Sequence, residues 1–348
     1  MNFKTCLFSL AIALFIVPSL SVQIQAAETG KTYRLLIVDA QKGEPYESVR
    51  VAMLAELEKL GFKEGKNLQV KHYSIGNKEG ATISIWDAES DSAHDVIFLN
   101  GTVAAAGFKK LALGNMKYKF VFGAVTDPIG EGLIDQFDVP PKANFTGVCY
   151  PVRVEDRLRF IRQIMPNARK FALIDADMPQ SQSYRKWVEE ALKLPEFKDI
   201  QVIFRSVEFV KSEEGHRRMT ELAKSHVLEL DPVVDVFITP NDQMGVQQPF
   251  AEMVFKNASK PLVAVGKKEV TDGWGATMSL YPDQEAAGRT IAGMIKQLFE
   301  GQPVKAIPPR WPQGGYAFDL GKAKKFKLNI PAKLLEAARK GGAVRLGN

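Results

Sequence analysis

Cysteine and histidine are scarce in the sequence, and their scarcity excludes several kinds of site. The 348 residues include two cysteines and four histidines. They form no His-x-x-x-His or Cys-x-x-Cys pair, so we expect no tetrahedral zinc site. Cys6 lies in an N-terminal segment that we expect to be removed, which leaves Cys149 without an intramolecular disulfide partner. We therefore interpret Cys149 as a small buried hydrophobic residue.

The sequence also lacks the short motifs of nucleotide and hydrolytic chemistry. It contains no P-loop that ends in Gly-Lys-Ser/Thr, no Gly-x-Gly-x-x-Gly turn after the first predicted strand and no Gly-x-Ser-x-Gly elbow. We therefore expect no catalytic residue, no cofactor and no metal. An enzyme that uses carboxylates stays open, because Asp and Glu pairs meet in space without a fixed sequence spacing.

Charges of one sign do not cluster. Lys and Arg number 46 and Asp and Glu number 40, which gives a net charge of +6, and the basic residues form no dense run. We therefore expect no nucleic-acid partner.

The N-terminal apolar run, residues 7–17, is only about a dozen residues long, short of the roughly 20 that a membrane-spanning helix needs. Lys4 precedes the run and Gln25-Ala26-Ala27 follows it, a pattern typical of a secretory signal with its cleavage site. We predict a cleaved signal peptide over residues 1–27 and a periplasmic mature chain. Loss of Lys4 lowers the net charge from +6 to +5.

The rest of the sequence has an ordinary globular composition, with 45% hydrophobic and 25% charged residues. At roughly 150 residues per domain, the length predicts about two compact lobes. Strand-length apolar runs alternate with helical patterns, which predicts an α/β fold with parallel sheets that helices flank. The predicted strands are residues 33–39, 67–73, 95–99, 119–124, 170–174, 201–205, 233–238, 261–265 and 276–280. The clearest predicted helices are residues 46–60, 156–165 and 283–300.

A proline-containing stretch near the middle, residues 138–144, interrupts this alternation. We predict that it links two lobes. The carboxyl ends of the parallel strands of both lobes would then face each other across a cleft, which is the expected functional site.

Small, polar and acidic residues follow several predicted strands. A Gly, Thr or Ser that leads into a helix exposes backbone N–H groups, which hold anionic groups such as a carboxylate. Asp127 and Asp242 would then hold a cation. Asp127 before Pro128 is equally consistent with a helix N-cap, and a capping role is equally available to Asp242 in its longer polar loop. Tyr281 either stacks on a ligand or fills the core. The candidate loops contain Asn100, Gly101 and Thr102, then Thr126 and Asp127, then Asp175, and finally Asn241 and Asp242.

Several segments, in the same order, resemble the family of ABC transporter substrate-binding proteins that includes tryptophan- and tyrosine-binding members. The most specific segment is residues 120–134, FVFGAVTDPIGEGLI, followed by Asn144 to Val148. Further similar segments are Gly61 to Asn67, Met165 to Ala168, Thr239 to Asp242 and Gly275 to Leu280.

The resemblance implies a two-lobed type I periplasmic binding protein fold with three crossovers, in which hinge closure encloses the ligand. By this pattern the N-terminal lobe takes residues 30–144 and 284–303, and the C-terminal lobe takes residues 145–283 and 304–348. The implied partners are a small-molecule ligand and an ABC permease in the inner membrane.

The resemblance also implies the binding residues. In amino-acid-binding relatives, the loop that matches Asn100-Gly101-Thr102-Val103 and a later Asn-Ser pair bind the ligand carboxylate, and the aspartate that matches Asp242 binds its ammonium. Here the Asn-Ser pair is Gln180-Ser181, and Val103 replaces the usual proline. These departures favour a solute other than an aromatic amino acid.

We therefore predict a non-enzymatic solute-binding protein of an ABC importer, with a small amino-acid-like ligand. Two alternatives stay open. One is a sensor subunit that presents its ligand-bound state to a membrane receptor, and the other is a secreted enzyme that uses Asp127, Asp175 and Asp242.

Overall fold

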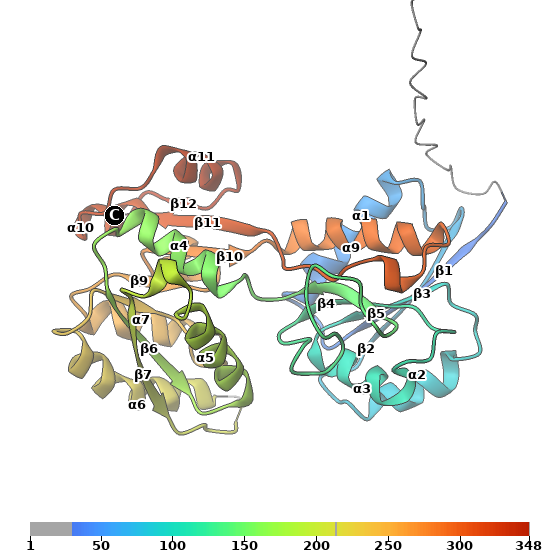
Figure 1. Ribbon diagram of the computed structural model, residues 1–348, viewed down its shortest axis with the longest axis horizontal. Coiled ribbons are helices and arrows are strands. Elements are labelled where there is room, and N and C mark those ends of the chain that lie inside the picture. Colours follow the sequence, from blue (N-terminus) through green and yellow to red (C-terminus); the bar gives the residue numbers. More distant parts are fainter. Residues whose placement is uncertain (1–29, 213, 348) are drawn as a thin grey trace, which may run out of the picture.

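Two α/β lobes lie side by side and are joined by three chain crossings (Figure 1). The computed structural model describes residues 30–212 and 214–347. The predicted signal peptide, residues 1–27, lies outside the described residues. No helix in the described part of the chain is both long and apolar enough to cross a membrane.

The N-terminal lobe is built on a five-stranded sheet, in the order β2-β1-β3-β4-β5, whose strands are all parallel. Apolar residues occupy successive positions in β3 and β4 because helices cover both faces. The strands are β1 (Tyr33–Asp39), β2 (Leu68–Ser74), β3 (Val96–Asn100), β4 (Phe120–Val125) and β5 (Phe145–Cys149).

Helices α1 (Tyr46–Lys59) and α9 (Gln284–Phe299) cover one face of this sheet, and α2 (Ala81–Glu89) and α3 (Thr102–Ala112) cover the other. Gly288 allows α9 to approach α1 closely, because a Cβ atom there would lie 2.5 Å from the carbonyl oxygen of Val49. The C-terminal part of the chain thus returns to complete the first lobe.

The C-terminal lobe has a seven-stranded sheet in the order β12-β11-β10-β9-β8-β6-β7. Its strands are parallel except for the antiparallel pair β10 and β11. The strands are β6 (Lys170–Ala176), β7 (Gln201–Val207), β8 (Val236–Ile238), β9 (Leu262–Ala264), β10 (Met278–Pro282), β11 (Gly314–Asp319) and β12 (Val344–Arg345).

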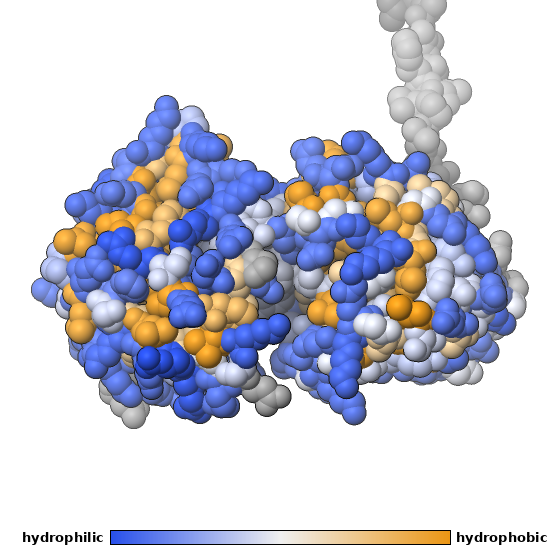
Figure 2. All heavy atoms as spheres, turned by 90° about the horizontal axis from the view of Figure 1, so that it is seen from below, coloured by the Kyte–Doolittle hydropathy of each residue, from blue (hydrophilic) through white to orange (hydrophobic). Residues whose placement is uncertain are grey.

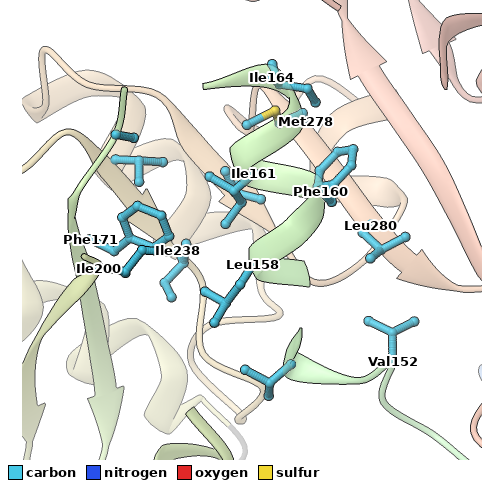
Figure 3. Packing of buried hydrophobic residues seen from close by; sticks show 14 of the residues in the cluster. Val152, Leu158, Phe160, Ile161, Ile164, Phe171, Ile200, Ile238, Met278 and Leu280 are labelled. Carbon is cyan, nitrogen blue, oxygen red and sulfur yellow. The ribbon is translucent and has the colours of Figure 1, made fainter. Parts of the chain in front are cut away.

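Helices cover both faces of this second sheet as well. On one face α4 packs Leu158, Ile161 and Ile164 against strand residues such as Phe171 and Met278 (Figure 3). This face also carries α5 and α11, and the opposite face carries α6, α7 and α8. The bounds are α4 (Val154–Ile164), α5 (Pro179–Ala191), α6 (Gly215–Leu230), α7 (Gln248–Asn257), α8 (Lys268–Thr271), α10 (Leu320–Lys325) and α11 (Ala332–Lys340).

Most predicted elements agree with the structure, but the predicted linker at residues 138–144 does not. This stretch is part of the loop between β4 and β5, and β5 pairs with β4 in the first sheet. The first crossing therefore follows Cys149, and the boundary expected at residue 144 is one strand too early. Val304 and Ile307 also pack in the core of the N-terminal lobe, so the third crossing lies later than residue 303.

Candidate functional site between the lobes

The carboxyl ends of both sets of parallel strands face a cleft between the lobes, and the space-filling view shows the surface hollowed there (Figure 2). Tyr150, on the first crossing, marks where the lobes meet. Burial raises the pKa of Tyr150 to about 12, with contributions from Glu269 of the C-terminal lobe and from Tyr46 and Glu44 of the N-terminal lobe. This tyrosine therefore lies within electrostatic reach of both lobes.

A polar network fixes the N-terminal side of the cleft. The carboxylate of Asp39, at the end of β1, pairs with Arg50, with His72 Nε2 at 2.9 Å and with Asn100 Nδ2 at 2.9 Å. Asn100 Nδ2 also donates to the carbonyl oxygen of Tyr46 at 2.9 Å. Burial, together with the charge of Arg50, lowers the pKa of His72. Asn100 Oδ1 is buried and has no hydrogen-bond partner among the described residues.

Helix α3 begins at this network with an uncapped N-terminus. Gly101 has φ of 116°, and a Cβ atom there would lie 2.6 Å from both Ala40 Cβ and Tyr46 Cε1. Glycine is required because an L side chain is strained in this conformation and has no room. No side chain caps α3, and Thr102 Oγ1 accepts a hydrogen bond from the Thr126 backbone. The first-turn N–H groups, including that of half-buried Val103, are thus available to an anionic group.

Asp127 caps a turn. Its Oδ1 accepts a hydrogen bond from the Gly130 backbone at 2.8 Å, and turns follow Pro128 in place of the helix that the N-cap interpretation expects. The carboxylate is half-buried at the end of β4.

Asp242 is saturated with donors from its own lobe. Oδ1 accepts from the backbones of Met244 and Gly245, and Oδ2 accepts from the Ala176 backbone and from Ser181 Oγ, all at 2.8–3.0 Å. Burial raises the pKa of Asp242, while three of these bonds lower it. In this structure Asp242 and Ser181 hold the β6 and β8 loops together.

Asp175 lies in a separate groove between α5 and β7. The side chain is buried, and both its oxygens accept hydrogen bonds from Arg185 Nη2, at 3.0 and 2.8 Å. Ser206 Oγ also donates to it, at 2.7 Å. The cavity here has a volume of about 290 Å³. Gln180 is exposed nearby, at the start of α5.

Tyr281 packs on the C-terminal lobe. Its hydroxyl lies against Gly315 of β11, where an added Cβ atom would be 2.6 Å away, and Lys267 Nζ is 5.8 Å from its ring. The ring belongs to the half-buried side chains around the core on the α6 and α7 face. The surroundings of Tyr281 therefore match the alternative in which its ring fills the core.

The sequence analysis identified Asn241 but missed its neighbours beside the hinge, Tyr150, Arg157 and Tyr184. Tyr150, Arg157, Tyr184 and Asn241 line a small cavity of about 10 Å³, enough for about one water molecule. A signal was present for Arg157, because it shares the helix face of Ile161 and Ile164 in a segment that was predicted as a helix. A charged residue on an apolar face indicates a special environment.

Comparisons with known proteins agree with this architecture. A sequence model described as ABC transporter substrate binding protein matches residues 49–341. No curated protein sequence matches significantly.

Similar solved structures include a conserved domain protein from Vibrio cholerae, with 19% identity and a TM-score of 0.66 over 88% of this chain and 98% of that chain. A Streptococcus pneumoniae ABC domain in complex with L-Trp has 18% identity and a TM-score of 0.64 over 88% and 98%. A ligand-free, open substrate binding protein with adhesive properties from Clostridium difficile has 18% identity and a TM-score of 0.72 over 86% and 97%. At these identities the structures show the shared fold.

Proposed function

Because the chain belongs to the family of ABC transporter substrate-binding proteins, we propose that it is the extracytoplasmic solute-binding subunit of an ABC importer. It captures a small amino-acid-like solute between its lobes by hinge closure and presents the closed form to a permease in the inner membrane. No reaction takes place on this chain.

The observation that carries this proposal is the placement of two preformed polar edges on opposite sides of a cleft. Each edge is formed by the carboxyl ends of parallel strands, and within the described residues three crossings join the two lobes. Rotation about a few crossing residues closes such a cleft while each sheet keeps its own core. Enclosure between two rigid lobes is the usual means of burying most of a small ligand's surface.

The amino-acid-like character is supported by the chemistry of these edges. The N-terminal lobe offers the uncapped start of α3, around Gly101, Thr102 and Val103, and the unpartnered Asn100 Oδ1. The C-terminal lobe contributes the polar loops around Gln180-Ser181 and Asp242, whereas Asp175 lies in the separate groove and is paired with Arg185. In our proposal Asp242 and Ser181 keep the loop in shape through their mutual bond, and the half-buried Asp127 lies at the rim.

Proteins with this fold bind different solutes, so the residues at the cleft edges must determine which ligand binds. The Streptococcus pneumoniae structure holds L-Trp, whereas a Bacillus halodurans solute-binding protein with a TM-score of 0.56 holds myo-inositol. A polyol has no charged group for a helix N-terminus or a buried carboxylate, and the edges described above contain both.

The test is a thermal-shift screen of the mature chain against amino acids, short peptides, organic acids, nucleosides and sugars. A solute present at about 100 times its Kd stabilises the folded state by about 2.7 kcal/mol, which is a shift of a few degrees for a chain of this size. We expect a hit among amino acids, and chromatography of the released compound should recover it unchanged. Hits only among sugars or nucleosides would contradict the amino-acid assignment, and conversion of the compound would contradict the binding role.

A further inference from the structure

Charged and aromatic side chains of the two lobes meet at one corner beside the hinge. Among the ion pairs of the described residues, one joins the lobes, and it links Asp138, in the loop between β4 and β5, with Arg153, which directly precedes α4. Among the ring pairs, Trp187 of α5 contacts Trp311 of the third crossing. Both contacts lie where the chain passes from one lobe to the other.

The backbone around Trp311 is fixed on both sides. Arg310 forms two backbone hydrogen bonds with β5 of the N-terminal lobe, at 2.8 and 3.2 Å. Gln313 accepts a backbone hydrogen bond at 2.9 Å from Asp283, on the second crossing. Trp311 and Pro312 lie between these anchors, so rotation of the lobes must change the backbone dihedral angles of this short segment.

The ring of Trp311 contacts side chains that belong to both lobes. It packs on Phe137 of the N-terminal core, with ring centroids 4.1 Å apart. Its centroid is 6.1 Å from that of Trp187, at an interplanar angle of 83°, and Trp187 packs against the core of the C-terminal lobe. The guanidinium of Arg153 lies 5.6 Å from the Trp311 centroid. One ring in the crossing therefore connects the two cores.

Asp138 adds a charged contact at the same corner. It follows Phe137, and its backbone N–H donates to the carbonyl oxygen of Pro309 at 2.9 Å, which fixes it to the N-terminal lobe. Its Oδ1 accepts a hydrogen bond from Arg310 at 3.2 Å, and its Oδ2 accepts one from Arg153. One carboxylate thus joins an arginine of its own lobe to an arginine of the other lobe.

The polar edges of the cleft do not hold the lobes in this way. Asn100 Nδ2 donates to Asp39 and Tyr46, both in the N-terminal lobe. The four hydrogen bonds that Asp242 accepts all come from the C-terminal lobe. The angle between the lobes is therefore stabilised beside the hinge and not across the cleft.

Contacts that exist at one lobe angle stabilise that angle alone. Closure of the cleft moves α4 and α5 relative to the N-terminal lobe, so the partners of Trp311 and Asp138 separate. A partly exposed ion pair, an edge-to-face ring pair and a cation–π contact are each weak, but together they bias the equilibrium between two lobe angles by about tenfold. A solute that binds the closed form must overcome this bias, which raises its apparent Kd.

This inference rests on the proposed function and concerns the control of its cleft. We propose that these contacts form an interlobe clamp that holds the cleft open and weakens solute binding without touching the solute. The residues of the interlobe clamp are Asp138, Arg153, Trp187 and Trp311, and none of them lines the cavity beside the hinge or the groove next to α5.

The first experiment measures affinity by calorimetry, with the amino acid that gives the largest shift in the thermal-shift screen. Arg153→Gln removes the charge of the interlobe ion pair, and Trp187→Leu removes the ring contact. Each should lower the Kd by about threefold, and the double variant by about tenfold, because the closed form becomes more populated. A damaged fold would weaken binding instead, so a gain in affinity distinguishes the interlobe clamp from a structural role.

The matched control is Arg159→Gln. Arg159 also lies on α4 and is partly exposed, but it pairs with Glu196 of its own lobe at 2.6 Å. This variant should bind the amino acid with the wild-type Kd. Urea unfolding of every variant shows that it is folded.

The second experiment needs no solute. Small-angle X-ray scattering of the mature chain should give a smaller radius of gyration for the double variant than for the wild type, shifted toward the value expected for the closed form. Arg159→Gln should keep the wild-type value. This measurement compares lobe angles whether or not the nature of the solute has been assigned correctly.

Two results would overturn the interlobe clamp. One is a folded double variant that binds the amino acid with the wild-type Kd or more weakly. The other is a radius of gyration that is the same for the double variant and the wild type without solute. If no solute binds in the screen, the proposed function fails, and scattering alone then decides whether these contacts hold the lobes apart.

Discussion

The two lobes differ in how their buried charged side chains are paired near the cleft. In the N-terminal lobe the carboxylate of Asp39 is bonded to Arg50, His72 and Asn100, so this buried charge is paired within the lobe. In the C-terminal lobe Arg157 and Glu269 are buried without contacting each other. The difference teaches that a buried charge is held in place either by an opposite charge, as Asp39 is, or by neutral hydrogen-bond acceptors, as Arg157 is.

The largest expected effect on stability comes from removing Asp39, whose charge is paired in the N-terminal lobe. Asp39→Ala leaves a cation, a histidine and an amide without their shared partner, so we expect a loss of about 3–5 kcal/mol in the free energy of unfolding. Arg157→Met, in the other lobe, removes an unpaired charge together with bonds to neutral oxygens and should cost less, about 1–3 kcal/mol. Urea unfolding at pH 7 measures both. Equal losses, or a larger loss for Arg157→Met, would contradict the comparison.

A second test measures how the free energy of unfolding depends on pH in the acidic range. Burial of Glu89 opposes its charged form, but hydrogen bonds from Lys71, Tyr73 and His94 outweigh this and lower its pKa to about 2. The stability contributed by this group is therefore present above its ordinary pKa near 4.5 and is lost as the pH falls toward 2. Because Lys71 is largely exposed, we expect about 2 kcal/mol in this window.

The matched variant is Glu89→Gln, which should flatten the curve of unfolding free energy between pH 4.5 and pH 2. Glu269 has the opposite sign, since burial raises its pKa: its contribution is present at low pH and is lost as the pH rises through the raised pKa. If Glu89→Gln leaves the dependence of unfolding free energy on pH unchanged between pH 4.5 and pH 2, Glu89 is not the group responsible.

The smallest expected effect concerns packing within the N-terminal lobe. Gly288→Ala places a Cβ atom 2.5 Å from the Val49 carbonyl oxygen and 2.8 Å from Ala52 Cβ, so α9 must shift away from α1. We expect a loss of about 1–3 kcal/mol. Gly293→Ala, in the same helix, meets nothing within 4 Å and should gain up to about 1 kcal/mol. Thermal unfolding distinguishes them, and a loss in both variants would argue against the close approach.

Much of the fold could be predicted because the signals were local. The apolar runs identified β1, β3, β4 and β6. The predicted helix 283–300 agrees with α9, which is followed by Gly301 with a φ of 89°. The role of β5 could not be predicted from residues 138–144, since its membership of the first sheet depends on pairing with β4 across a long loop. Likewise, the antiparallel strand β11 has a glycine at each of its first two positions, which weakens its strand signal.

The loops of the candidate site could be predicted from the sequence, but the hydrogen-bond partners of their side chains could not. Asn100, Gly101 and Asp242 were identified from their positions after strands. That Asp242 is saturated depends on Ala176 and Ser181, which are distant in the sequence. Arg157 and Glu269 lie on helices α4 and α8, and their lack of ion-pair partners among the described residues depends on three-dimensional packing.

The central claim is that the lobes close around one intact solute. Small-angle X-ray scattering of the mature chain, alone and with an amino acid that binds, tests it most directly. We predict a smaller radius of gyration in the saturated sample, a stoichiometry of one solute per chain and recovery of the unchanged compound. An unchanged radius of gyration at saturation would contradict closure between the lobes.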